Sequence, residues 1–142
     1  MPDDLAITDF PLRARDKLRY GDTDRQGHVN NAVFSTFLET GRVELIYGQA
    51  GRLAEPGTAF VLARLELDFR AELLWPGEVE IGTRVASVGR SSVRLQQAIF
   101  QGERCVASGL SVIVQMDDAT RKARPFSDAV REQLERLAAP AA

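Results

Sequence analysis

The longest helical pattern in the chain lies between residues 31 and 49. Apolar residues recur there at intervals of three and four, at Phe34, Phe37, Leu38, Gly41, Leu45 and Ile46. This spacing predicts an amphipathic helix. Asn30 is a good N-cap, because its side-chain oxygen can accept a backbone N–H of the first turn, and Gly48 and Gly51 are suited to end the helix. Because Gly41 costs about 1 kcal/mol in a helix interior, we expect the backbone of another segment to approach it closely.

Most of the remaining chain alternates apolar and polar residues, as is typical of strands with one buried face. A short strand is predicted over residues 15–20, and longer ones over 60–70, 79–85, 93–99 and 104–116. Turn residues separate the last four. In the first long strand the inner side consists of Val61, Ala63, Leu65, Leu67 and Phe69, whereas the last strand has apolar or small residues on both sides near its middle.

These elements predict an α+β fold and a single domain over residues 1–142. A short helix at 128–137 follows the strands, with Ser127 as its N-cap. The simplest packing is a curved antiparallel sheet of about five strands wrapped around one long helix. Residues 1–12 are expected to be a partly mobile lead-in. Since such a sheet leaves open edges and a second face, we expect a homo-oligomer, either a dimer or a tetramer.

Composition excludes several classes of protein. The 142 residues carry 18 Lys and Arg against 20 Asp and Glu, a net charge of −2, which gives no global field for binding nucleic acid. No apolar run is long enough to span a membrane, and the acidic opening residues predict no secretory signal. Cys105 and His28 are the single residues of their types, too few for a Cys/His zinc site. The expected location is the cytoplasm.

The loop that precedes the long helix concentrates polar chemistry. Asp22, Asp24, His28, Asn30 and Asn31 lie within ten positions. A helix N-terminus presents unpaired N–H groups and a partial positive charge, so it can stabilise an oxyanion. A carboxylate just before it can attack a carbonyl or activate water.

Three interpretations of this loop compete. The first is an ordinary turn, in which the aspartates bind nearby amides and Asn30 caps the helix. The second is a calcium loop, which is disfavoured because Gln26 and Val33 stand where carboxylate or amide ligands are needed. The third is an active site.

The third interpretation gains from a resemblance. The stretch from Tyr20-Gly21-Asp22-Thr23-Asp24 to Gly27-His28-Val29-Asn30-Asn31, followed by Phe34, Phe37, Glu39 and Arg42, resembles the signature of hotdog-fold acyl-CoA thioesterases of the 4-hydroxybenzoyl-CoA thioesterase-like family. Further similarities are Trp75-Pro76-Gly77-Glu78, Gly89-Arg90-Ser91-Ser92 and a late Arg124-Pro125. The resemblance covers roughly residues 13–137.

The resemblance implies a hotdog fold and hydrolysis of acyl thioesters without a metal or cofactor. Asp24 matches the family's catalytic carboxylate, acting as nucleophile or as general base. The oxyanion contact falls on the backbone N–H of Asn31, with Asn30 as the alternative. His28 is expected to be a group that positions the substrate or to make a loop hydrogen bond. We expect Asp22 to point elsewhere and brace the loop.

Other residues are candidates for binding the substrate. Arg90, Ser91 and Ser92 form a turn suited to the phosphates of coenzyme A, and Arg90 matches a phosphate contact in the family; a solvated turn is the alternative. Phe34, Phe37 and Phe69 line an acyl pocket or, more commonly for such spacing, belong to the core. Cys105 is expected to pack rather than react.

Several functions stay open. One is hydrolysis of thioesters on acyl carrier protein. Another is a non-catalytic module that binds acyl ligands, although such a module does not need Asp24. A dehydratase would need a catalytic histidine, and the position of His28 fits a thioesterase better. Fold alone does not decide among these.

Overall fold

The computed structural model describes residues 5–48 and 53–138. In chain order the elements are η1 (Ile7–Asp9), β1 (Leu12–Lys17), η2 (Tyr20–Asp22), α1 (Asn31–Tyr47), β2 (Thr58–Phe69), β3 (Glu78–Val88), β4 (Ser92–Gln101), β5 (Arg104–Asp117) and α2 (Asp128–Arg136). Within these residues, no helix combines the length and the apolar character needed to cross a membrane.

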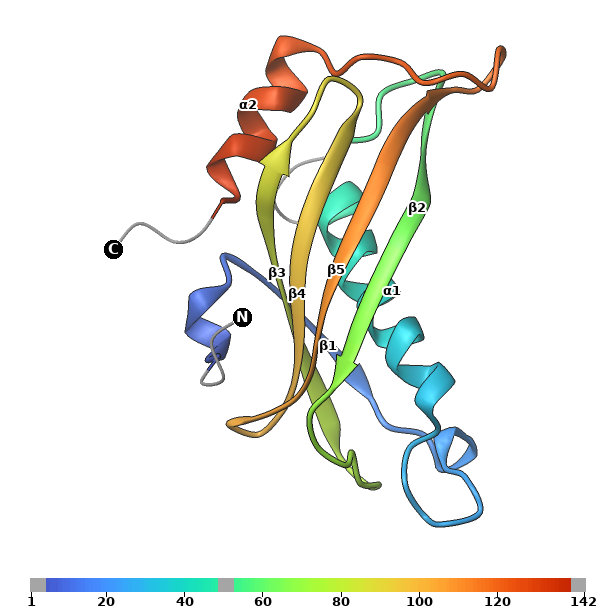
Figure 1. The fold of residues 1–142 in the computed structure, drawn as a ribbon, viewed down its shortest axis with the longest axis vertical. Coiled ribbons are helices and arrows are strands. Elements are labelled where there is room, and N and C mark those ends of the chain that lie inside the picture. The colour runs from blue at the N-terminus through green and yellow to red at the C-terminus, as the bar shows by residue number, and fades with distance from the viewer. Residues whose placement is uncertain (1–4, 49–52, 139–142) are drawn as a thin grey trace.

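The five strands form one antiparallel sheet in the order β1-β3-β4-β5-β2. The long helix α1 lies along one face of this curved sheet, and α2 lies near the hairpin that joins β3 and β4 (Figure 1). The predicted α+β hotdog architecture, with five strands, one long helix and a short C-terminal helix, is therefore confirmed. Asn30 caps α1 as predicted, its side-chain oxygen accepting from the N–H of Ala32 at 2.9 Å.

The predicted bounds of the first strand are wrong, whereas Gly48 ends the long helix as predicted. The first strand spans Leu12–Lys17 instead of 15–20, because Tyr20 and Gly21 belong to the single turn of η2. The long helix ends at Tyr47, where the N–H of Gly48 closes the last turn on the carbonyl of Glu44. The predicted continuation to Gln49 and the predicted stop at Gly51 lie outside the described residues.

The strand β2 departs from strict alternation. Its pairing with β5 shifts between Leu62 and Arg64, so that Ala63 forms a bulge and is exposed, although its position in the sequence predicts an inner face. The strand also lies at the edge of the sheet, where its other side has no neighbouring strand among the described residues. An edge position and a bulge together explain why even its apolar residues are only partly buried.

Part of the predicted lead-in is packed against the sheet. Leu5 and Phe10 are buried and contact Ala98 and Phe100 on the face opposite α1. Gly82 on β3 accommodates the Phe10 ring, because a Cβ at this position would lie 2.5 Å from a ring carbon. Residues 1–4 of the lead-in lie outside the described residues.

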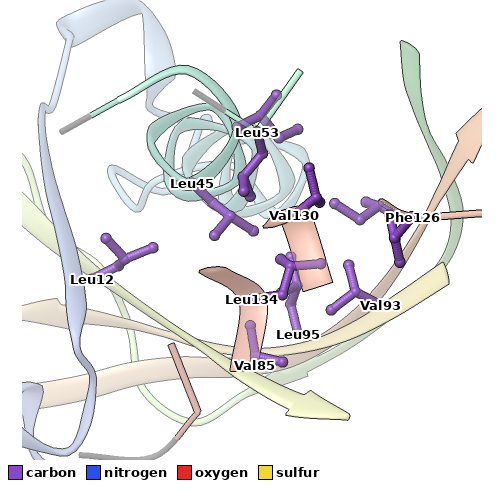
Figure 2. Packing of buried hydrophobic residues seen from close by; sticks show 11 residues of the cluster. Leu12, Leu45, Leu53, Val85, Val93, Leu95, Phe126, Val130 and Leu134 are labelled. Carbon is purple, nitrogen blue, oxygen red and sulfur yellow. The ribbon is translucent and has the colours of Figure 1, made fainter. Parts of the chain in front are cut away.

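One part of the core joins α1, α2 and the sheet (Figure 2). Val130 and Leu134 of α2 pack with Leu45 of α1 and with Val93 and Leu95 of β4. Ser127 caps α2, its Oγ accepting from the N–H of Val130 at 3.2 Å, as the sequence predicts. The helix α2 therefore closes the end of the sheet that is remote from the start of α1.

A buried polar network fixes α1 to the sheet. The Gln97 amide of β4 donates to the Leu38 carbonyl and to Thr83 Oγ1, both at 3.0 Å, and Ser111 Oγ donates to Gln97 Oε1 at 2.9 Å. The guanidinium of Arg42 donates to Ser111 Oγ at 3.3 Å. Burial lowers the pKa of Arg42, although the nearby Glu39 charge opposes this shift.

Gly41 lies against this network. A Cβ at this position would lie 2.7 Å from the Gln97 amide nitrogen, 2.7 Å from Ile81 Cγ2 and 2.8 Å from Thr83 Oγ1. The expected approach of another backbone to Gly41 is wrong, because side chains of the sheet make the close contact instead. A glycine here therefore serves close packing between helix and sheet.

Candidate active site

A cavity of about 390 Å³ lies between the loop before α1 and the segment that follows β2. Its lining comprises Asp24, Gln26, His28, Val29, Asn31, Phe34, Phe69, Arg70, Ala71, Glu72 and Leu73. Three predicted site residues, Asp24, His28 and Asn31, therefore line one cavity at the N-terminus of α1. Among the cavities the structure describes, this is the one that joins a carboxylate to a helix N-terminus.

Asp24 is exposed on the cavity wall, and the two oxygens of its carboxylate differ in their hydrogen bonding. Oδ1 accepts from the backbone N–H of Gln26 at 2.8 Å and of His28 at 3.2 Å. Gly27 adopts a φ of +83°, which a tight turn needs and glycine allows. The turn interpretation of the loop is thus confirmed, but it involves one oxygen only. Oδ2 meets no hydrogen-bond donor in the described part of the chain.

Asp22 braces the loop, as predicted. It is buried, and its Oδ2 accepts from the backbone N–H of Arg19 while its Oδ1 accepts from the Arg19 guanidinium, both at 2.9 Å. Its carbonyl accepts from the N–H of Asn30 at 2.8 Å. The loop that carries Asp24 is therefore tied to the helix start through Asp22.

The first turn of α1 includes an N–H, that of Asn31, for which no acceptor is found in the described part of the chain. The Asn30 side-chain oxygen accepts a hydrogen bond from the N–H of Ala32, and the Asn30 carbonyl accepts one from the N–H of Val33. The N–H of Asn31 has no hydrogen-bond acceptor within residues 5–48 and 53–138, as the geometry of a helix start requires. Since Asn31 lines the cavity, this end of the helix offers a donor and a partial positive charge beside Asp24.

Two phenylalanines form the apolar part of the wall. Phe34 and Phe69 meet edge to face, with ring centroids 5.1 Å apart. Phe34 is buried in the core, whereas Phe69, at the end of the edge strand, is 52 % exposed. Phe37 is buried in the same core cluster and does not line the cavity. Of the three candidates, two therefore border the cavity and one belongs to the core.

Glu72 is a cavity residue that the sequence interpretation missed. Its Oε2 lies 3.4 Å from His28 Nε2. The two residues are 44 positions apart, and they meet because the loop and the segment after β2 pair through their backbones, with an isolated bridge between His28 and Leu74. The sequence did not mark Glu72 as a site residue, because an exposed glutamate after a strand is common.

Arg90, Ser91 and Ser92 do not join this cavity within one chain. Their hairpin lies beside α2, at the opposite end of the sheet from the loop of Asp24 (Figure 1). The carbonyls of Arg90 and Ser91 accept from the N–H groups of Phe126 and Gln115, so the turn is held in place. The sequence placed these residues in one site with Asp24, and the structure separates them.

Cys105 is half-buried at the start of β5, and its Sγ lies 3.3 Å from the carbonyl of Ala107. Burial raises the pKa of its thiol, with the nearby Arg70 charge opposing the shift. A raised pKa lowers the thiolate fraction at neutral pH, so the packing role expected from the sequence fits better than a nucleophile. Within the described residues, no group of three or more His, Cys, Asp or Glu side chains is arranged to hold a metal ion.

The fold recurs in solved structures. The PA5185 protein from Pseudomonas aeruginosa PAO1 superposes with a TM-score of 0.85 over 96 % of this chain and 98 % of its own, at 24 % identity. A thioesterase from Thermus thermophilus, solved with coenzyme A and Zn, has a TM-score of 0.79 and 33 % identity over 91 % of this chain and 95 % of its own. The architecture is thus that of the hotdog-fold proteins.

The sequence comparisons define the family. The family model of the thioesterase-like superfamily matches residues 18–134. The chain belongs to this superfamily, and the expectation of a thioester hydrolase is confirmed. Protein YsmA of Bacillus subtilis is 26 % identical over 89 % of this chain and 87 % of its own. The acyl-CoA thioester hydrolase YbgC of Escherichia coli O6:H1 is 28 % identical over 69 % of this chain and 75 % of its own.

Proposed function

We propose that this enzyme hydrolyses acyl-CoA thioesters to a free acid and coenzyme A, with Asp24 as the reacting carboxylate. The observation that carries the proposal is the pairing of the Asp24 carboxylate with the unpartnered N–H of Asn31 on one cavity wall. The relatives support coenzyme A as the carrier, because one is an acyl-CoA thioester hydrolase and another was solved with coenzyme A. The alternative carrier, acyl carrier protein, has no such support.

The residues divide the chemistry between them. The N–H of Asn31 donates to the thioester oxygen as negative charge develops on it. Asp24 either attacks the acyl carbon, displacing the thiolate and forming an anhydride that water then cleaves, or removes a proton from the attacking water. In both routes water supplies one oxygen to the acid, and the C–S bond breaks. Neither route needs a metal or cofactor.

The acyl group fits the apolar wall. Phe34 and Phe69 offer an aromatic surface beside the proposed oxyanion contact, while the exposed side of Phe69 leaves that end open. The proposal is tested by incubating the purified protein with short, long and aromatic acyl-CoAs and measuring the release of thiol. Hydrolysis of at least one class is expected, and no release from any of them would refute the proposal.

We further propose that the enzyme is a homo-oligomer built on the β2 edge. The strand β2 is 12 residues long, and its outer side has no neighbouring strand in the described chain. Exposed apolar side chains of Val43 and Tyr47 on α1 line one pocket together with Leu62 of β2. A long edge with apolar neighbours favours pairing with a second copy, and a two-fold axis would make the two β2 strands antiparallel.

This arrangement predicts an oligomer in solution whose stability depends on the edge. The wild-type mass is expected to be that of two or more chains by light scattering. Leu62→Lys, which adds a charge at a 46 % exposed edge position, should shift the protein toward single chains. Leu74→Lys, at a similarly exposed position outside β2, is the control. A wild type that is monomeric at micromolar concentration would contradict the proposal.

Antiparallel pairing would also reunite the separated site residues. The start of β2 lies near the Arg90 hairpin, because Phe60 pairs with Gln115 and Gln115 bonds to Ser91. Phe69, at the other end of β2, lines the cavity. The Arg90 hairpin of one copy would therefore lie toward the cavity of its partner, where Arg90, Ser91 and Ser92 could bind phosphate.

Arg90→Ala is expected to raise the KM for acyl-CoA about fivefold, because a phosphate contact is lost. The KM for an acyl-pantetheine, which lacks the nucleotide phosphates, should not change. The difference should shrink as ionic strength rises. Arg15→Ala, which removes an exposed arginine from β1, is the control. An unchanged KM for acyl-CoA would remove Arg90 from the site.

The proposed location is the cytoplasm. One half-buried cysteine, with no second cysteine in the chain to pair with, suits a reducing compartment.

A further inference from the structure

The pair formed by His28 and Glu72 lies on the cavity wall, and the proposed reaction assigns no role to Glu72. His28 Nε2 lies 3.4 Å from Glu72 Oε2, with the two side chains 34 % and 65 % exposed. A carboxylate accepts hydrogen bonds only, so Nε2 must carry a proton to bind it. In a neutral ring, Nδ1 is then the acceptor.

The backbones of both residues are fixed by contacts on either side. His28 pairs with Leu74, and the N–H of Val29 donates to the Leu73 carbonyl at 2.9 Å. The hairpin between β4 and β5 holds the same segment from outside. Arg104 Nη2 donates to the Glu72 carbonyl at 2.8 Å, and the Gln101 amide donates to the Leu74 carbonyl at 2.7 Å. Glu72 is therefore presented to His28 from an anchored segment.

Charged groups from several elements contact His28 or the Glu72 segment, and Arg70 lines the same cavity. The loop contributes the Asp24 carboxylate, which accepts the backbone N–H of His28. The segment after β2 contributes Glu72, and β5 contributes the Arg104 guanidinium at the Glu72 carbonyl. Asp24 thus holds the backbone of His28, and Glu72 contacts its ring. One residue connects the proposed catalytic carboxylate to a second carboxylate on the same wall.

We propose that Glu72 is a positioning residue, which acts by holding the His28 imidazole in one orientation toward the bound thioester. The functional part of this inference rests on the proposed acyl-CoA hydrolysis, but the contact itself does not. Because the two side chains are partly exposed, the expected contribution is that of a solvent-screened contact, or about fivefold in rate.

A double-mutant cycle tests the proposal. Glu72→Ala should lower kcat/KM about fivefold when His28 is present. In the His28→Ala background the same change should have almost no effect, since there is no ring left to orient. Glu72→Gln, which keeps an acceptor at this position, should recover part of the loss. An equal loss in both backgrounds, or no loss in either, would overturn the proposal.

A second measurement needs no substrate. His28 is the single histidine of the chain, so its ring resonances are assigned without ambiguity. Glu72→Ala should increase the ring mobility measured by carbon relaxation, whereas Glu132→Ala, which removes an exposed ion pair on α2, should not. An unchanged ring in Glu72→Ala would refute the contact. A wild type without thioesterase activity would refute the proposed function. The relaxation measurement would then still test whether Glu72 holds the His28 ring.

Discussion

Asp24→Asn should lower kcat by at least about 100-fold, in line with the roughly 10²–10⁴ that a positioned catalytic group contributes. The substitution is nearly isosteric and keeps an oxygen that can accept from the N–H groups of Gln26 and His28. It removes the negative charge that both proposed routes require. The loop should therefore keep its shape while the reaction fails, and KM should change much less than kcat. Initial rates of thiol release over a range of acyl-CoA concentrations give both constants.

Asp9→Asn is the matched control for this change. The Asp9 carboxylate also accepts a backbone N–H, that of Ala6 at 2.9 Å, but it belongs to η1 and is not among the residues that line the cavity. The kcat of the Asp9→Asn protein should equal that of the wild type. Near-normal turnover in a correctly folded Asp24→Asn protein would instead show that this carboxylate does not react. The catalytic group would then have to be sought elsewhere on the wall.

Gly41→Ala should lower the free energy of unfolding by about 2 kcal/mol. Alanine is favoured over glycine in a helix by about 1 kcal/mol. However, the added Cβ would lie within 2.8 Å of Gln97, Ile81 and Thr83. Overpacking of this kind costs about 1–3 kcal/mol, and moving Gln97 aside also breaks hydrogen bonds in a buried network, at about 1–3 kcal/mol for a group left unpaired. The unfavourable terms exceed the favourable one.

The measurement is denaturant unfolding with a thermal scan, for which 1 kcal/mol corresponds to about 3 °C in Tm. Gly21→Ala is the control, because a Cβ there would meet no atom within 4 Å. It should change stability by less than about 0.5 kcal/mol. A Gly41→Ala protein as stable as the wild type would mean that the helix and sheet can separate at this point without cost.

Local patterns in the sequence predicted the fold well because its elements are strongly periodic. The α1 stripe, its Asn30 cap and the four long strands follow from spacing and turn residues alone. The errors arose where the chain leaves regular geometry. Single turns of helix begin at Ile7 and Tyr20, and a bulge forms at Ala63 on a strand whose edge position no local pattern reveals.

The site was predictable to the extent that it is contiguous in sequence. Asp24, His28 and Asn31 lie in one loop and line one cavity. Glu72 was missed because its contact with His28 depends on long-range pairing, which sequence spacing does not encode. The proposed role of Arg90 depends on which end of the sheet the hairpin occupies and on the proposed pairing with a second copy of the chain.

The polar network beneath α1 makes the helix difficult to displace. A slide by one residue would move α1 by about 1.5 Å and rotate its faces by roughly 100°. The Gln97 amide would then lose its bond to the Leu38 carbonyl, and the Arg42 guanidinium would lose its bond to Ser111 Oγ. Apolar packing alone would allow α1 to take several positions along the curved sheet, but the hydrogen bonds of this network favour one position. The position of the α1 N-terminus, with the N–H of Asn31, is consequently fixed by contacts made several helical turns away.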